Sequence, residues 1–275
     1  MIFPSDCHVH TPYCDGRAKM EAMAARAYEL GYTSLGFSPH SPLPYANSFF
    51  GMHPKSEALY RAKIQELQLL YRQKMDILMG IEWDLDTNYA FPRYDYRIGS
   101  VHRLNCGRYS FEVDCTKEEL VKGIRDAFGG DVNAFATAYF SEVERSAMRR
   151  GVDIVGHFDL PTKFNSPPEV IDETDAEYRE IALNALRRIA KARPDLVFEV
   201  NTGAMSRLNR TSPYPAPFLL REMAKLGLRI TLTSDAHTTD GLAFWQEGAL
   251  ALCRRSGVRK LVYLTKDGFK PFPLR

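Results

Sequence analysis

The sequence predicts an α/β barrel that spans residues 1–275 as one domain. Apolar runs of strand length alternate along the chain with amphipathic stretches of helical length, and no linker divides it. The length of 275 residues also suits a barrel, because such domains commonly have about 250 residues. Seven or eight strand–helix units favour a closed barrel, but an open doubly wound parallel sheet stays a possible alternative.

Eight segments have the character of buried parallel strands. Each is short, apolar and bounded by Gly, Pro, Asp or Ser. The expected strands are Ile2–His8, Thr33–Ser38, Asp76–Glu82, Tyr96–His102, Asp153–His157, Val197–Asn201, Arg229–Ser234 and Lys260–Leu264.

Helices are expected between these strands. Thr116 and Glu119 have the spacing of a capping box that opens one helix. In the first helix, Met20, Met23, Ala24, Ala27 and Leu30 recur at helical spacing, and Gly31 follows as a stop. Other helices are expected over 56–73, 133–150, 173–192, 216–226 and 242–256, with loops over the barrel mouth at 89–96 and 105–114.

Composition excludes several classes of protein. A formal charge of +2, from 36 basic and 34 acidic residues, does not favour binding to nucleic acid or to an anionic membrane. The five cysteines include no CxxC pair, which predicts reduced thiols in a reducing compartment. The start has no basic segment followed by an apolar one, and no apolar run approaches the roughly 20 residues of a membrane span. We therefore expect a cytoplasmic protein, whose oligomeric state the sequence leaves open.

The histidines gather at predicted strand ends. Six of the seven lie at, or within about two residues of, the carboxyl end of a strand, and in a parallel barrel these ends converge on the face that carries active sites. The six are His8, His10, His40, His102, His157 and His237. The seventh, His53, lies in a loop and is interpreted as a surface residue.

Three carboxylates accompany these histidines: Asp15, Glu82 and Asp235. Residues i and i+2 of a strand point to one side, so His8 and His10 can grip one ion together. Imidazole and carboxylate ligands suit Zn²⁺, Mn²⁺ or Fe. Nine such groups exceed what one ion needs, and we expect two or three divalent ions with a carboxylate bridging them.

Several motifs resemble the polymerase-and-histidinol-phosphatase (PHP) superfamily along nearly the whole chain. In chain order they are Asp6-Cys7-His8-Val9-His10-Thr11, Asp15-Gly16, Ser38-Pro39-His40-Ser41-Pro42-Leu43-Pro44, Gly80-Ile81-Glu82, Gly99-Ser100-Val101-His102, Gly156-His157-Phe158-Asp159-Leu160 and Thr233-Ser234-Asp235-Ala236-His237. The Ser-Pro-Leu-Pro and Gly-Ser-Val-His runs are most similar to the branch of monofunctional histidinol-phosphate phosphatases.

The resemblance implies a distorted (β/α)₇ barrel of the TIM type, with three metal ions at the carboxyl ends of its strands. One of the eight expected strands, the last, would then lie outside the barrel. The implied ligands are His8, His10, Glu82 and Asp235 for the first ion, Asp15, His40 and His237 for the second, and Glu82, His102 and His157 for the third. Pro39 departs from the family, which usually has an acidic residue there, and this puts in doubt the strength of the second site.

These ligands predict hydrolysis of a phosphomonoester. Bound metal lowers the pKa of water and neutralises phosphoryl oxygens, so in-line attack by a metal-bridging hydroxide is the natural mechanism. We expect Glu82, Asp235 and His237 to be catalytic. Lys163 and Arg207 follow strand ends where the family places its phosphate-binding residues. The acid for the leaving alcohol stays open among Asp159, His53 and a metal-bound water.

The expected substrate is a small phosphate ester, first of all L-histidinol phosphate. Its ammonium and imidazole groups need acceptors and an aromatic wall, for which Trp83, Asp84, Asp86, Tyr94 and Tyr96 are available. The alternatives are a PHP phosphatase or nucleotidase with another ester, an amidohydrolase-type metal hydrolase, and a non-catalytic PHP module. The last would lack ligands, and none is missing from the sequence.

Overall fold

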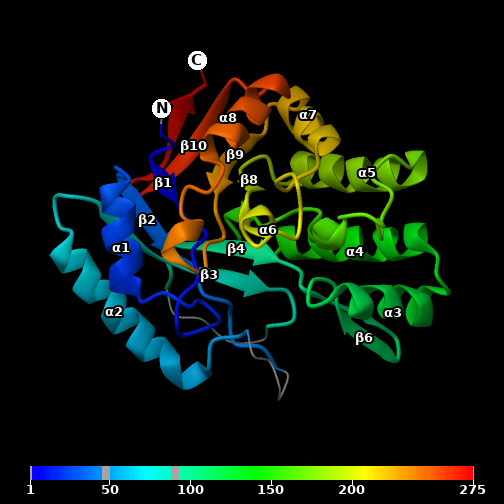
Figure 1. Ribbon diagram of the computed structural model, residues 1–275, viewed down its shortest axis with the longest axis horizontal. Coiled ribbons are helices and arrows are strands. Elements are labelled where there is room, and N and C mark those ends of the chain that lie inside the picture. The colour runs from blue at the N-terminus through cyan, green and yellow to red at the C-terminus, as the bar shows by residue number, and fades with distance from the viewer. Residues whose placement is uncertain (1, 45–49, 88–92, 275) are drawn as a thin grey trace.

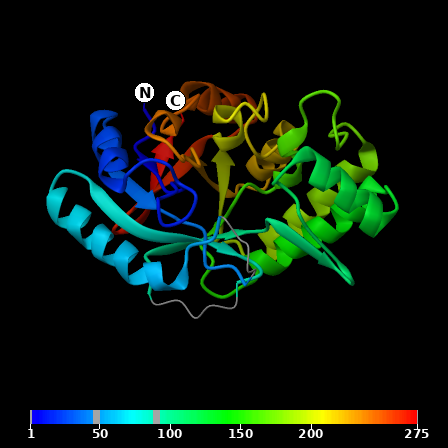
Figure 2. The ribbon, with the colours of Figure 1, turned by 60° about the horizontal axis from the view of Figure 1, so that its bottom comes forward.

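The protein forms a seven-stranded parallel sheet that curls into a nearly closed barrel with helices outside it (Figures 1 and 2). The computed structural model describes residues 2–44, 50–87 and 93–274. In spatial order the strands are β1 (Ser5–Asp6), β2 (Ser34–Phe37), β3 (Asp76–Asp84), β4 (Tyr96–Ser100), β7 (Ile154–Val155), β8 (Val197–Asn201) and β9 (Arg229–Thr233). The predicted α/β barrel class is confirmed.

The first and last strands meet just beyond their ends. Val9 and Ala236 form a parallel bridge, and the His10 amide donates to the Ala236 carbonyl at 3.0 Å. The barrel is thus closed at the end where the predicted histidines lie.

Eight α-helices are present in the described residues, and most cover the outside of the barrel. They are α1 (Met20–Glu29), α2 (Glu57–Leu70), α3 (Lys117–Phe128), α4 (Val132–Ala147), α5 (Ala176–Ala192), α6 (Gly203–Ser206), α7 (Pro217–Lys225) and α8 (Gln246–Arg255). Three short 3₁₀ turns are η1 (Pro54–Ser56), η2 (Leu160–Phe164) and η3 (Thr239–Gly241). In Figure 1, α1 and α2 flank one side and α3, α4 and α5 the other.

The expected capping box is half formed. The Thr116 hydroxyl accepts a hydrogen bond from the Glu119 amide at 3.0 Å, as predicted. The Glu119 carboxylate accepts from the amide of Glu112 instead of returning to Thr116. The last helix begins at Gln246 rather than Leu242, because Ala243 and Trp245 have positive φ angles of 58° and 51° that no helix contains.

Residues 105–114 do not form the predicted loop. They belong to a hairpin of β5 (Arg103–Cys106) and β6 (Tyr109–Glu112), which turns at Gly107 with φ of 61°. Leu104 and Phe111 are paired across the hairpin and buried, and the Phe111 ring packs where Gly123 of α3 has no side chain. In the other predicted loop, 89–96, residues 89–92 lie outside the described residues.

The base of the barrel is closed by a second hairpin, β10 (Lys260–Thr265) and β11 (Gly268–Pro273). Val262 and Leu264 join the apolar cluster inside the barrel, and the Ser34 hydroxyl at the start of β2 donates to the Leu264 carbonyl. The expected eighth strand therefore lies outside the seven-stranded sheet, as the resemblance implied.

Tyr96 fills the barrel interior above this hairpin. Its hydroxyl donates to the Cys7 carbonyl at 2.7 Å, and a side chain at Gly36 or Gly80 would collide with its ring. Together the hairpin and Tyr96 make the lower half of the barrel apolar. None of the described helices is long and apolar enough to span a membrane.

Candidate metal centre

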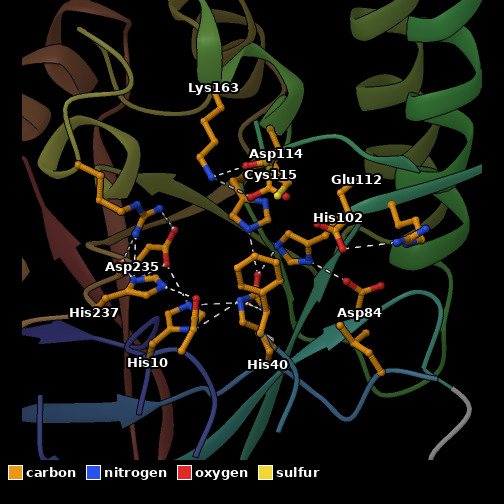
Figure 3. A pocket seen from close by; sticks show the side chains of 18 of the residues that line it. His10, His40, Asp84, His102, Glu112, Asp114, Cys115, Lys163, Asp235 and His237 are labelled. Carbon is orange, nitrogen blue, oxygen red and sulfur yellow. Dashed lines mark hydrogen bonds and ion pairs between the residues drawn. The ribbon is translucent and has the colours of Figure 1, made fainter. Parts of the chain in front are cut away.

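All nine predicted ligands come together at the carboxyl ends of the strands. Figure 3 labels His10, His40, His102, Asp235 and His237 among them. The segment after β1 carries His8, His10 and Asp15, and His40 follows β2. Glu82 lies within β3, His102 follows β4, His157 follows β7, and Asp235 and His237 follow β9. Strand-end placement in a parallel barrel is what brings residues so distant in sequence into one cluster.

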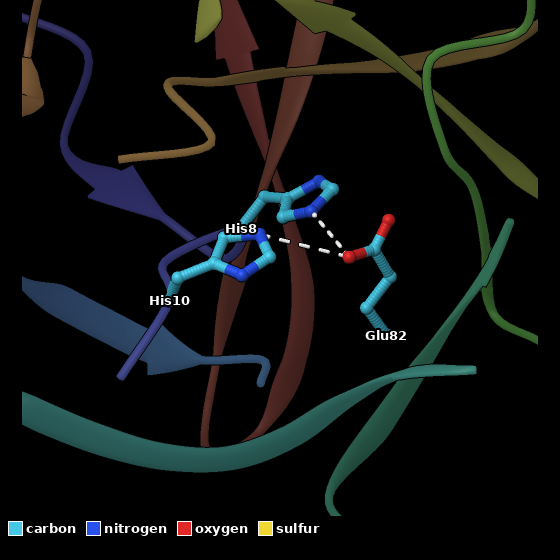
Figure 4. A group of neighbouring side chains, drawn as sticks. All are labelled: His8, His10 and Glu82. Atoms are coloured by element: carbon cyan, nitrogen blue, oxygen red, sulfur yellow. Dashed lines mark ion pairs between the residues drawn. The ribbon is translucent and has the colours of Figure 1, made fainter. Parts of the chain in front are cut away.

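Glu82 is the centre of the cluster. Its Oε1 lies 2.9 Å from His157 Nε2 and 3.3 Å from His102 Nε2. Its Oε2 lies 2.9 Å from His40 Nδ1 and between 3.5 and 3.6 Å from the Nε2 atoms of His8 and His10 (Figure 4). A carboxylate that faces five imidazoles from both oxygens has the geometry of a bridging ligand.

Asp235 and Asp15 lie on the other side of His10. Asp235 Oδ1 is 3.0 Å from His10 Nε2, and Asp15 Oδ1 is 3.0 Å from His10 Nδ1. Asp15 Oδ2 continues to His237 Nε2 at 3.0 Å. Asp235 adopts a φ of 51°, and a Cβ at Gly203 would collide with its side chain, so both the turn and the glycine are needed to place this carboxylate.

Two carboxylates behind the histidines were not predicted in this role. Glu199 Oε2 lies 2.9 Å from His8 Nδ1, and Asp84 Oδ2 lies 2.7 Å from His102 Nδ1. Both are buried. The signal for Glu199 was a charged residue in the middle of the apolar strand Val197–Asn201, where an unpaired carboxylate would be costly. Asp84 was expected at the mouth, and it does line the cavity while its carboxylate also contacts His102.

The histidines and carboxylates of the cluster stabilise one another's charged forms. Burial alone would raise the pKa of Glu82, but the surrounding histidines outweigh it and hold the pKa well below its usual 4.5. Burial would likewise lower the pKa of His8 and of His102, yet the carboxylates raise both well above 6.5. Carboxylates that remain ionised beside proton-rich imidazoles favour cations in place of those protons.

The donor set fits divalent metal ions. His8 Nε2 and Glu82 Oε2 are buried, and neither has a hydrogen-bond partner among the described residues. Four groups from the cluster have ligand atoms within 4.8 Å of one another, and all consist of imidazole and carboxylate. They are His8–His10–Glu82, His8–His157–Asp235, His10–Asp15–His237 and His40–Glu82–His102. These groups overlap the three implied ligand sets but assign His40 and His157 to different neighbours.

Arg207 and Lys163 both line the cavity over the cluster. Arg207 donates to the Asp235 carbonyl at 3.0 Å and to its Oδ2 at 3.1 Å, and its Nη1 lies 2.9 Å from His237 Nδ1. Lys163 donates to the carbonyl and Oδ2 of Asp114, at 2.6 and 3.0 Å. Arg207 therefore lies beside Asp235 and His237, and Lys163 lies beside Asp114, as Figure 3 shows for Lys163.

The cavity has a volume of about 260 Å³, which suits a small molecule. Besides the cluster it is lined by apolar side chains of Leu43, Phe50 and Leu160 and by polar Arg17, Arg103 and Glu112. A ligand there would meet the imidazoles and carboxylates of the cluster at the floor and the cationic side chains of Arg207 and Lys163 on the walls.

A sequence comparison identifies the family. The profile of the PHP domain matches residues 6–203, which is most of the chain and ends just after β8. The chain belongs to the PHP domain family. The predicted resemblance is therefore confirmed.

Curated relatives align along almost the whole PHP chain. A protein of Deinococcus radiodurans named "Probable histidinol-phosphatase" is 29% identical, over 94% of this chain and 95% of its own. The histidinol-phosphatase of Bacillus subtilis is 26% identical, over 90% of this chain and 98% of its own. A histidinol phosphate phosphatase from Lactococcus lactis, solved with zinc, L-histidinol and phosphate, has a TM-score of 0.75 at 21% identity, over 97% and 98% of the two chains.

Pro39, the residue that departs from the PHP pattern, lies beside the central carboxylate of the cluster. The Pro39 carbonyl accepts from the Glu82 amide at 3.0 Å, and the next residue, His40, has its Nδ1 2.9 Å from Glu82 Oε2. His40 therefore lies directly against the central carboxylate.

Some expected substrate contacts are wrong. Tyr96 is inside the barrel, and Tyr94 is buried beside Tyr60, with ring centroids 6.5 Å apart. The Trp83 ring lies under the Arg149 guanidinium at 3.6 Å, and Asp86 accepts from the Asn105 amide. None of these four side chains lines the described cavity. Phe50 is the aromatic ring that lines the described cavity.

Two candidates for the proton donor also lie elsewhere. Asp159 is fully buried and accepts from the Ala216 amide at 2.8 Å, and it does not line the described cavity. His53 is exposed and accepts from the Lys55 amide at the start of η1, as expected for a surface residue. Neither side chain faces the cluster.

Proposed function

We propose that this protein is a metal-dependent phosphomonoesterase that hydrolyses L-histidinol phosphate to L-histidinol and phosphate. The observation that carries the proposal is the cluster of nine histidine and carboxylate side chains under a small cavity with basic walls. Histidinol-phosphatases are also the curated relatives that align along nearly the whole chain.

Two or three divalent ions, Zn²⁺, Mn²⁺ or Fe²⁺, would be held by the nine side chains. The ligands are His8, His10, Asp15, His40, Glu82, His102, His157, Asp235 and His237. Bound there, such ions supply a water of lowered pKa and a Lewis acid for the phosphoryl group. Glu82 contributes the charge that lets cations lie close together, since it faces five of the histidines.

The phosphate dianion is bound from above by Arg207 and Lys163. Arg207 presents a planar fork of donors, which suits phosphoryl oxygens, and its position over Asp235 and His237 places it at the edge of the cluster. Lys163 approaches from the wall of Asp114. Both cations neutralise charge that builds up as the ester bond breaks.

A phosphatase panel tests the proposal. The purified protein is supplied with Mn²⁺, Zn²⁺ or Fe²⁺ and offered histidinol phosphate, nucleotides and sugar phosphates. We expect the highest kcat/KM for histidinol phosphate. A higher kcat/KM for another ester would overturn the substrate while leaving the phosphatase activity in place, and no release of phosphate from any ester would overturn both.

A further inference from the structure

Glu199 is a buried carboxylate at which four elements of the barrel mouth meet. It lies in the middle of β8, with 1% of its surface exposed. Its Oε2 is 2.9 Å from His8 Nδ1 and accepts from the Thr233 hydroxyl at 2.8 Å. Its Oε1 accepts from the His157 amide at 2.5 Å and from the Asn201 side-chain amide at 2.9 Å. Both oxygens therefore have two donors each.

This arrangement fixes the protonation of one ring nitrogen. An ionised carboxylate can only accept, so His8 Nδ1 must carry a hydrogen. The lone pair of neutral His8 then belongs to Nε2, which faces Glu82 Oε2 at 3.5 Å and Asp235 Oδ1 at 3.8 Å. Nε2 is also the nitrogen that lacks a hydrogen-bond partner among the described residues. The ring thus presents a free ligand atom to the centre of the cluster.

Glu199 holds more than one ligand in place. Through the His157 amide it fixes the backbone that carries a second imidazole of the cluster, whose Nε2 lies 2.9 Å from Glu82. The same carboxylate accepts a hydrogen bond from Thr233 of β9, which lies two residues before Asp235. Its negative charge lies directly behind His8 and makes that imidazole a stronger donor to a cation.

We propose that Glu199 is a positioning residue that sets the affinity of the metal centre by fixing the tautomer of His8 and the backbone of His157. The inference rests on the proposed metal-dependent function, and it adds a residue that is not a ligand. Glutamine is not a neutral replacement here. An amide has only one acceptor oxygen, so its NH₂ group would face two of the four donors.

The test compares Glu199→Gln with Asp159→Asn. Both variants change one fully buried carboxylate near the mouth to its amide, but Asp159 contacts none of the cluster side chains among the described residues. Metal affinity is measured on full-length protein by titration of the metal-free form with Zn²⁺ and with Co²⁺, whose absorption spectrum reports ligand geometry. We expect Zn²⁺ to bind Glu199→Gln roughly 10- to 100-fold more weakly and the Co²⁺ spectrum to change. Asp159→Asn should match the wild type in both.

Wild-type Zn²⁺ affinity and Co²⁺ spectrum in a folded Glu199→Gln protein would overturn the proposal, as would equal losses in Asp159→Asn. Glu199→Asp keeps the charge but draws the carboxylate back from His8, so we expect an intermediate affinity. If Glu199→Gln does not fold, Glu199→Asp decides, and a wild-type affinity in that variant overturns the inference. No substrate is used, so the result is independent of which phosphate ester the enzyme cleaves.

Discussion

The histidine–carboxylate cluster has an inner and an outer half that differ in burial. The inner half is His8, Glu82 and His157, whose side chains are between 0 and 3% exposed. The outer half is Asp15 and His237, which are 22% and 17% exposed and line the open cavity. The same residue types thus occupy two environments within one site.

The two halves also differ in what lies behind their histidines. His8 Nδ1 faces only acceptors, since the carboxylate of Glu199 is its partner. His237 Nδ1 instead lies 2.9 Å from both the Asp235 carbonyl, an acceptor, and the Arg207 guanidinium, a donor. The contact of His8 therefore fixes its tautomer, whereas the two contacts of His237 favour different tautomers. On the proposed function, we expect the inner half to retain cations and the outer half to exchange cations and contact substrate.

Complete metal removal should have the largest effect. We expect a strong chelator to abolish activity and Mn²⁺, Zn²⁺ or Fe²⁺ to restore it. Because Arg207 repels a cation in the outer half, the ions should leave in two steps, the outer before the inner. Metal analysis along a chelator titration measures this. Loss of all ions in one step would contradict the difference between the halves, and a metal-free preparation with full activity would contradict the metal centre itself.

Glu82→Gln should be the most damaging single change. It removes the central charge, which His8, His40 and His157 all face. Loss of an electrostatic contact to the transition state commonly costs roughly 10²–10³ in turnover. Steady-state kinetics with circular dichroism as a check on folding measure it, with Glu222→Gln in α7 as the control. Unaltered turnover in folded Glu82→Gln would mean that the cluster works without its central carboxylate.

Arg207→Ala and Lys163→Ala should weaken handling of phosphate without removing the inner ions. A charge-assisted hydrogen bond contributes about 1.5–3 kcal/mol, so we expect a loss of roughly 10- to 100-fold in kcat/KM for Arg207→Ala. Lys163→Ala should lose less, because an ammonium group cannot make the bidentate contact with phosphoryl oxygens that a guanidinium makes. Kinetics and metal analysis of both variants separate the two effects. Unchanged kcat and KM in either variant would assign that residue to the surface.

Asp159→Asn should have the smallest effect on activity and a visible effect on stability. Burial raises the pKa of Asp159 from 3.8 to about 6, so the native state favours its protonated form. Stability from this group is present below pH 3.8 and is lost as pH rises toward 6. Above pH 6, the free energy of unfolding of the variant should therefore exceed that of the wild type by up to about 3 kcal/mol. This difference should shrink at lower pH.

Urea unfolding of both proteins at pH 4 and pH 8 measures the difference. A loss of turnover in Asp159→Asn comparable to that of Glu82→Gln would show that carboxylates outside the cluster matter as much as those within it.

Sequence patterns predicted the parts of this site that follow from strand geometry. His102 and His157 could be placed because each follows an apolar run, and a parallel barrel brings such ends together whatever the intervening chain. The order of strands around the barrel needed no further information, since β1 to β9 follow the chain apart from the inserted β5–β6 hairpin.

Features that depend on packing could not be predicted. Glu199 and Tyr96 both lie in strands, and only the register of neighbouring strands decides that one reaches His8 and the other fills the barrel. The partner of Lys163 is Asp114, which follows a hairpin whose Phe111 packs against Gly123. Such contacts join residues far apart in sequence and leave no periodic signal.

The β10–β11 hairpin limits how reactants and products can enter and leave the barrel. Because Val262 and Leu264 fill the barrel below Tyr96, the floor of the reaction chamber is solid. Among the described residues, Asp15 and His237 are the most exposed of the nine cluster side chains, so on the proposed function we expect reactants and products to pass over them. The alcohol and the phosphate would then leave by the same route, and added inorganic phosphate should slow the entry of the next substrate.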